Sequence, residues 1–253
     1  MNSTWFRRYT PAVGNGPRLV CFPHAGGSAT AYKPLAHALP ADLDVVAVQY
    51  PGRQDRYDEA PFTAVGPLVE AVAGELARSL ARDPGRPYAL FGHSMGALVA
   101  FETARRLERA GLPAPQRLFL SGRGAPDSPS GERYRNYDDA AVLAEVRRLS
   151  GTDQALLDNP EVLEMVLPAL RADYRAVATY TWDGGEPVPV PVTALIGDRD
   201  PVVTVGEARG WREHTRGGFA LKVFPGGHFY LNDQVEQVAS AVTEGLLARA
   251  AAS

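Results

Sequence analysis

One short stretch constrains the fold of this chain more than any other. Residues 88–97 read Tyr-Ala-Leu-Phe-Gly-His-Ser-Met-Gly-Ala, an apolar run that ends in a Gly-x-Ser-x-Gly pattern and leads into a helical pattern. A serine on a very tight turn from a strand into a helix adopts strained dihedrals, and Gly92 and Gly96 remove the side chains that would collide there. The pattern alone also occurs in ordinary turns, but here both flanks fit. The stretch therefore predicts that Ser94 is a nucleophile raised above the edge of a sheet.

Two backbone N–H groups are candidates for stabilising negative charge near Ser94. The helix expected at residues 95–109 directs its N-terminus at the serine, so the N–H of Met95 and the helix dipole favour a developing oxyanion. The second candidate lies in Pro-His-Ala-Gly-Gly-Ser, residues 23–28, where small residues follow an apolar strand and leave N–H groups uncovered. We assign the N–H of Ala25 to this role. The alternative is that the glycine pair serves only as a flexible turn.

Short apolar strands alternate with helical patterns along the chain. Besides the run before Ser94 and a short edge strand within 5–9, strands are expected at residues 18–22, 44–50, 117–121, 189–196 and 220–224. Besides the helix after Ser94, helices are expected at residues 29–39, 63–82, 205–214 and 232–249. This order predicts an α/β fold with a mainly parallel sheet covered on both faces. Ligands of such sheets bind at the carboxyl ends of the strands, where the glycine-rich loops of this chain lie.

The regular alternation stops between Ser121 and Val190, because about 70 residues lie there and an ordinary connection needs far fewer. Helices are expected at residues 138–149 and 159–180, the second with a kink at Pro168. We interpret residues 123–188, approximately, as a helical lid inserted into a single domain that spans residues 1–253. A packed decoration without a gating role is the alternative.

Composition and charge exclude several classes of protein. A net charge of −3 provides no positive electrostatic field for binding nucleic acid and no basic face for binding an anionic membrane. No apolar run reaches the roughly 18 residues of a membrane span, and the first residues lack a signal-peptide core, so we expect a cytoplasmic protein. The single cysteine, Cys21, excludes an internal disulfide and is expected to be buried. No metal-ligand spacing, phosphate loop or dinucleotide fingerprint is present, so neither metal nor cofactor is expected.

A serine hydroxyl needs a base to take its proton and a carboxylate to orient that base. Of the five histidines, His228 alone ends a C-terminal strand in a Gly-Gly turn, and Asp198 and Asp200 follow the strand before it. The order Ser, Asp, His is that of α/β-hydrolases. Two residues separated by one point to the same side of an extended segment, so geometry does not choose between the aspartates.

The other four histidines are expected to have structural or supporting places. His93 should pack beneath the turn of Ser94, and His24 should line the glycine-rich turn after the strand at residues 18–22. His37 and His214 are expected on helix surfaces.

Five motifs together resemble the type II thioesterases of polyketide and nonribosomal peptide synthetases. They are Pro-His-Ala-Gly-Gly-Ser-Ala at 23–29, Gln-Tyr-Pro-Gly-Arg at 49–53, Gly-His-Ser-Met-Gly at 92–96, Gly-Asp-Arg-Asp at 197–200 and Gly-His-Phe-Tyr-Leu at 227–231. The third motif is shared by all α/β-hydrolases, whereas the first two are much narrower signals. The resemblance, together with Pro201, selects Asp200 as the acid that orients His228.

The resemblance implies hydrolysis of stalled or aberrant acyl groups from the phosphopantetheine thiol of an acyl or peptidyl carrier protein. Ser94 would form an acyl-enzyme, with His228 as base and then acid. A monomer is expected. The alternatives are a carboxylesterase or a peptidase on the same fold, or a non-catalytic protein that binds a ligand or a carrier protein.

Overall fold

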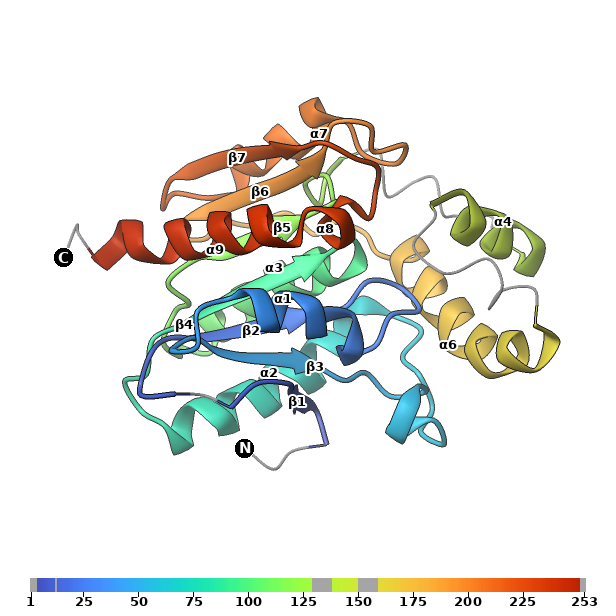
Figure 1. The fold of residues 1–253 in the computed structure, drawn as a ribbon, viewed down its shortest axis with the longest axis horizontal. Helices are drawn as coiled ribbons and strands as arrows, with labels where there is room; N and C mark the ends of the chain where they lie inside the picture. The colour runs from blue at the N-terminus through green and yellow to red at the C-terminus, as the bar shows by residue number, and fades with distance from the viewer. Residues whose placement is uncertain (1–3, 12, 129–137, 150–158, 251–253) are drawn as a thin grey trace.

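The computed structural model describes residues 4–11, 13–128, 138–149 and 159–250 (Figure 1). Its centre is a sheet of seven strands in the order β1-β3-β2-β4-β5-β6-β7. In chain order the strands are β1 Phe6–Arg8, β2 Arg18–Phe22, β3 Asp44–Val48, β4 Tyr88–His93, β5 Leu118–Ser121, β6 Val192–Gly197 and β7 Phe219–Phe224. Only the pairing of the edge strand β1 with β3 is antiparallel in this sheet of the described chain, and the other pairs are parallel. The predicted α/β class is confirmed.

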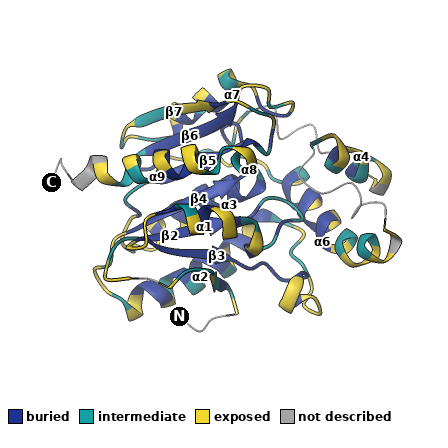
Figure 2. Ribbon diagram, in the orientation of Figure 1, coloured by how far each residue is buried: buried dark blue, intermediate teal, exposed yellow. Residues whose placement is uncertain are grey.

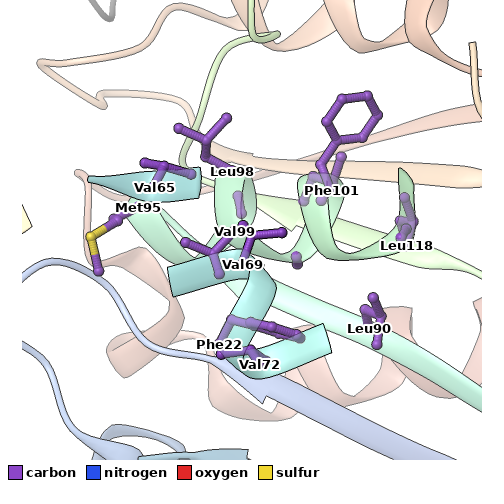
Figure 3. Close-up of a cluster of buried hydrophobic side chains, with 14 of the residues drawn as sticks. Phe22, Val65, Val69, Val72, Leu90, Met95, Leu98, Val99, Phe101 and Leu118 are labelled. Atoms are coloured by element: carbon purple, nitrogen blue, oxygen red, sulfur yellow. The ribbon is translucent and has the colours of Figure 1, made fainter. Parts of the chain in front are cut away.

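Helices cover both faces of the sheet because successive strand residues point to opposite sides. Val20 and Phe22 of β2 belong to the core formed with α2 Val65–Arg82 and α3 Met95–Arg109, part of which Figure 3 shows. Leu19 and Cys21 face the opposite core, formed with α1 Lys33–Ala38 and α9 Val235–Ala250. The inner strands β2 to β6 are accordingly buried along their whole length, whereas the edge strands β1 and β7 are partly exposed and the helices expose one side (Figure 2).

Several expected elements are divided or shortened in the structure. The segment at 29–39 is a 3₁₀ turn, Ala29–Tyr32, followed by α1. The segment at 205–214 is α7 Val205–Arg209 and a 3₁₀ turn, Gly210–His214, and the last helix is preceded by the short α8 Tyr230–Asp233. The strand expected from residue 189 begins only at Val192, since Pro189 and Pro191 have no N–H to give to a ladder.

The two helices expected between β5 and β6 are present. They are α4 Asp139–Leu149 and α6 Pro160–Ala178, which contact each other and lie beyond the carboxyl ends of β2 and β3 (Figure 1). Asn159 caps α6 by accepting a hydrogen bond from the N–H of Glu161 at 3.0 Å. Pro168 lies inside α6 without ending it. Residues 129–137 and 150–158 of the proposed lid lie outside the described residues.

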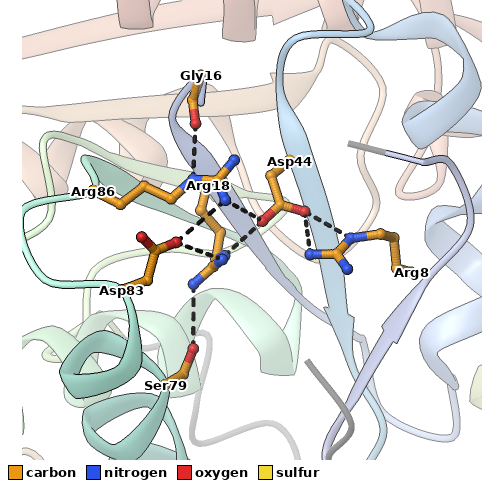
Figure 4. A network of polar contacts seen from close by, with 7 residues as sticks. All are labelled: Arg8, Gly16, Arg18, Asp44, Ser79, Asp83 and Arg86. Atoms are coloured by element: carbon orange, nitrogen blue, oxygen red, sulfur yellow. Dashed lines mark hydrogen bonds and ion pairs between the residues drawn. The ribbon is translucent and has the colours of Figure 1, made fainter. Parts of the chain in front are cut away.

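A buried charge network joins the amino ends of β2 and β3 (Figure 4). The carboxylate of Asp44 accepts hydrogen bonds from Arg18 Nε and Arg8 Nε, both at 2.8 Å, and Arg86 Nη1 lies 3.2 Å away. Burial alone would raise the pKa of Asp44, but the hydrogen bonds and charges of Arg18 and Arg8 outweigh it and hold that pKa below its ordinary value.

We expect Asp44→Asn to lower the free energy of unfolding at pH 7 by about 3 kcal/mol, because it leaves Arg18 buried without its main counter-charge. The contribution is present above the unfolded-state pKa of about 4 and is lost as the pH falls through the lower folded-state pKa. Urea unfolding at pH 7 measures it. The matched variant is Asp83→Asn, at a half-exposed partner of Arg18, and it should lower the free energy of unfolding by less than about 1 kcal/mol. Equal losses of stability in the two variants would contradict this account.

No helix in the described part of the chain is both long and apolar enough to cross a membrane.

Candidate active site

Ser94 lies between the last residue of β4 and the first residue of α3. Its backbone has φ 55° and ψ −119°, a region that side-chain-bearing residues rarely adopt. A Cβ on Gly92 would lie 2.1 Å from the carbonyl oxygen of Gly96, and one on Gly96 would lie 1.9 Å from that of Phe22. Both positions therefore require glycine. The N–H of Ser94 donates to the carbonyl oxygen of Ser121 at 2.8 Å, which ties the turn to β5.

His228 lies in the loop between β7 and α8, and its partner is Asp200. His228 Nδ1 lies 2.8 Å from Asp200 Oδ2, and both side chains are almost fully buried. The other oxygen, Asp200 Oδ1, accepts hydrogen bonds from the N–H groups of Val202 at 2.8 Å and Val203 at 3.2 Å. A carboxylate held at both oxygens favours the tautomer with the proton on Nδ1, which leaves His228 Nε2 as the basic atom.

Asp198 has a different partner, although it follows the same strand. Its Oδ1 accepts from the N–H of Gly226 at 2.8 Å and pairs with the exposed Arg199. The Gly226 hydrogen bond and the pairing with Arg199 hold the pKa of Asp198 below its usual range. Asp198 thus connects the loops after β6 and β7, and the structure brings only Asp200 of the two to His228.

Ser94 and His228 line one cavity at the carboxyl edge of the sheet. Its remaining walls come from the loop after β2, from Phe229, and from apolar side chains of α4 and α6, which are Val146, Leu149, Val166, Leu170 and Tyr174. An adjoining small cavity is lined by Ser94 together with Ala25 and Met95. The nucleophile candidate therefore faces both an apolar chamber and the two expected oxyanion donors.

The N–H groups of the loop at residues 23–28 are not equivalent. Gly26 N–H donates to Asp173 Oδ2 at 2.7 Å, and Gly27 N–H donates to the carbonyl oxygen of His24 at 2.9 Å. Among the described residues, no protein acceptor takes the N–H of Ala25 or that of Met95. These two groups remain available to a ligand, as an oxyanion hole requires.

Two further histidine rings pack around His228. The ring centroid of His93 lies 5.0 Å from that of His228, and His93 Nδ1 lies 2.9 Å from Ser121 Oγ, which in turn lies 2.7 Å from the hydroxyl of Tyr230. Burial, reinforced by the neighbouring histidines, lowers the pKa of His93 well below its usual value. Burial also lowers the pKa of His24 to about 4, with His228 and Arg53 adding to the effect. Both rings stay neutral at pH 7, so a positive charge can develop on His228 without protonated neighbours.

The expectation for His214 is wrong. This residue is buried in the 3₁₀ turn after α7, where its ring contacts Trp182 and Trp211 and its Nε2 lies 3.0 Å from Asp127 Oδ1. The segment is a tight 3₁₀ turn rather than an exposed helix. The His214 side chain therefore packs against Phe101 instead of facing solvent. His37 is exposed and Cys21 is buried, as expected.

We expect His24 to make the protein sensitive to mild acid. Its folded-state pKa is about 4 and its unfolded-state pKa is about 6.5, so stability is full above pH 6.5 and is lost as the pH falls toward 4. The loss at pH 5 should be about 2 kcal/mol from His24 alone. Urea unfolding at pH 7.5 and 5.0 measures it, with His37→Asn as the exposed control. An unchanged pH dependence in His24→Asn would contradict the assignment.

The ion pair between Arg53 and Asp173 is a feature of the site that the sequence patterns did not predict. Arg53 Nη1 lies 2.7 Å from Asp173 Oδ2, and Nη2 lies 3.0 Å from Oδ1, with both side chains buried. A signal was present, since Asp173 lies on α6 between the apolar residues Leu170 and Tyr174 that face the cavity, and a buried carboxylate needs a partner. Among the described residues, no group of three histidine, cysteine or acidic side chains is arranged to hold a metal ion.

Comparisons with known proteins agree with this arrangement. The family model of the thioesterase domain matches residues 17–246. Thioesterase PikA5 of Streptomyces venezuelae is 46% identical over 247 residues, covering 96% of this chain and 85% of its own. A probable cadicidin biosynthesis thioesterase of Streptomyces griseus is 46% identical over 242 residues, and there the match spans 96% of this chain but 66% of the relative.

Solved structures of similar proteins cover almost the whole chain. The type II thioesterase BorB from the borrelidin biosynthetic cluster is 44% identical with a TM-score of 0.82, covering 97% of this chain and 99% of its own. YbtT, the type II thioesterase from the yersiniabactin pathway, is 33% identical with a TM-score of 0.84, covering 96% and 98%.

Proposed function

The chain belongs to the thioesterase domain family, as a type II thioesterase with an α/β-hydrolase fold, and from that premise we propose that it releases acyl groups from the phosphopantetheine arm of carrier proteins. Ser94, His228 and Asp200 form its catalytic triad, and the N–H groups of Ala25 and Met95 form its oxyanion hole. The observation that carries the proposal is the shared cavity, which places Ser94 and His228 beside apolar walls from α4 and α6. An acyl chain on those walls would present its carbonyl to Ser94.

The reaction proceeds through an acyl-enzyme. Ser94 Oγ attacks the thioester carbonyl while its proton passes to His228 Nε2, and the oxyanion is stabilised by the two N–H groups. The C–S bond then breaks, and the proton on His228 goes to the departing pantetheine thiolate. Water then attacks the acyl-enzyme while His228 takes its proton, and that proton passes to Ser94 Oγ as the ester bond breaks, so the free acid leaves and Ser94 is restored.

The biological role that fits this reaction is editing of polyketide or nonribosomal peptide synthesis. A hydrolase that accepts an acyl chain in an apolar chamber can remove stalled or aberrant groups from a carrier protein. The segment between β5 and β6 acts as a lid in a single domain, because α4 and α6 supply chamber walls. The carrier-bound arm must pass these helices to reach Ser94.

A panel of substrates tests the proposal. We would offer the protein acyl-loaded acyl and peptidyl carrier proteins, acyl-pantetheine thioesters, simple oxygen esters and peptides, and follow release by intact mass and product analysis. We expect carrier-bound and pantetheine thioesters to be hydrolysed with the highest kcat/KM. Preference for oxygen esters or peptides would identify an esterase or a peptidase on the same fold, and binding of loaded carrier protein without release would identify a non-catalytic adaptor.

A further inference from the structure

Asp173 and Arg53 connect two parts of the molecule that are far apart in the sequence. Asp173 lies on α6, whereas Arg53 lies in the loop after β3, and the two form a bidentate ion pair with distances of 2.7 Å and 3.0 Å. Arg53 Nε also donates to the carbonyl oxygen of Pro51 at 3.2 Å, and the Arg53 guanidinium lies 5.3 Å from the ring centroid of Tyr50. A buried guanidinium with all these partners has a fixed orientation.

The same pair holds the loop that carries the oxyanion donor. Asp173 Oδ2 accepts the N–H of Gly26 at 2.7 Å, and Arg53 Nη1 donates to the carbonyl oxygen of Gly27 at 3.0 Å. Gly26 has a φ of +74°, and a Cβ there would lie 2.5 Å from Leu170 Cδ1 of α6. The two residues that follow Ala25 are therefore held from three sides, Gly26 by the Asp173 carboxylate and by Leu170 of α6, and Gly27 by the Arg53 guanidinium.

The charges of the pair matter for the oxyanion. A lone carboxylate on the N–H of Gly26 would place a negative charge one residue from the donor at Ala25 and would oppose a second negative charge on the substrate. Arg53 neutralises that carboxylate at the same oxygen that holds Gly26. A neutral pair can fix the loop without this electrostatic cost.

We propose that Asp173 and Arg53 are positioning residues that set the Ala25 N–H for the oxyanion and couple it to the seating of α6. The inference rests on the proposed function, in which Ala25 is an oxyanion donor. Leu170 and Tyr174, one turn or less from Asp173, line the cavity beside Ser94. When α6 packs against the acyl chain, Asp173 accepts the N–H of Gly26. The oxyanion hole is therefore complete only when α6 is in this position.

Three variants test the proposal on a short acyl-pantetheine thioester and on a p-nitrophenyl ester. Arg53→Gln leaves the carboxylate uncompensated and should lower kcat by about 100-fold, with KM changed by less than about threefold. Asp173→Asn should lower kcat by about 10-fold, since the amide oxygen can still accept from Gly26. The double variant should have a kcat at least about 10-fold higher than that of Arg53→Gln, because the negative charge of Asp173 that opposes the oxyanion is removed.

Affinity for a trifluoromethyl ketone separates positioning from a merely structural role. This ketone forms a tetrahedral adduct on Ser94 whose oxygen is negative, so its inhibition constant should weaken by the same factor as kcat/KM in each variant. Arg56→Gln is the matched control, since Arg56 is a buried arginine three residues away that pairs with Glu59 and lies over Trp5. It should keep kcat within about threefold.

Losses confined to KM, or unchanged ketone affinity in a folded Arg53→Gln variant, would overturn the proposal. If Arg53→Gln fails to fold by circular dichroism, Arg53→Lys and Asp173→Asn decide the question by the same two measurements. Failure of the proposed function would give a different result. The wild-type protein would then not hydrolyse the acyl-pantetheine thioester, whereas hydrolysis of the p-nitrophenyl ester would still give the ratio of kcat between the variants.

Discussion

Ser94→Ala is expected to abolish thioester hydrolysis while the protein folds as before. The change removes the hydroxyl that His228 would activate, and kcat should fall by at least about 10⁴. The fold should persist because Gly92 and Gly96, not the hydroxyl, allow the turn, and alanine tolerates the φ of 55° no worse than serine. The free energy of unfolding should change by less than about 1 kcal/mol.

Product release and intact mass together check this expectation. Wild type mixed with a slowly hydrolysed acyl-pantetheine should gain the mass of the acyl group, and Ser94→Ala should not. Ser240→Ala, on the exposed side of α9, is the control and should behave as wild type. Turnover near the wild-type rate in Ser94→Ala would rule out this serine as the nucleophile.

The parts of the fold that local chemistry dictates could be predicted from the sequence. The turn at Ser94 was predictable because a strand, two glycines and a helix leave few other conformations. The sequence predicts the following helix at residues 95–109, and the structure has Met95–Arg109. The parallel sheet followed from continuous apolar runs such as Leu19–Phe22, which are buried on both faces.

Features that depend on tertiary contacts could not be predicted in the same way. The residues around His214 predict a helix with this side chain on its surface, whereas the 3₁₀ turn in the structure brings the His214 ring against Trp182 and Trp211. The Arg53–Asp173 pair joins residues 120 positions apart, and neither the loop nor the helix pattern alone shows which carboxylate meets which guanidinium. Local hydrophobic patterns predict helices, strands and their buried faces, but they do not predict which buried charged residues pair with one another.

The choice between Asp198 and Asp200 shows the same limit and gives the second large expected effect. Asp200→Asn should lower kcat by about 10⁴. The Asn oxygen would keep the hydrogen bonds from Val202 and Val203, and so its NH₂ group would face His228 Nδ1. That nitrogen would then have to accept, the proton would move to Nε2, and His228 could no longer take the proton of Ser94.

Asp198→Asn is the matched comparison, because it makes the same chemical change two residues away. Its amide oxygen can still accept from the N–H of Gly226, and the side chain is half-exposed, so kcat should stay within about threefold of wild type. Steady-state kinetics of both variants on one thioester, with unfolding curves to show that both are folded, make the comparison. If Asp198→Asn proved the more damaging change, the acid would be misassigned, while Ser94 and His228 would keep their roles, since neither depends on which aspartate holds the imidazole.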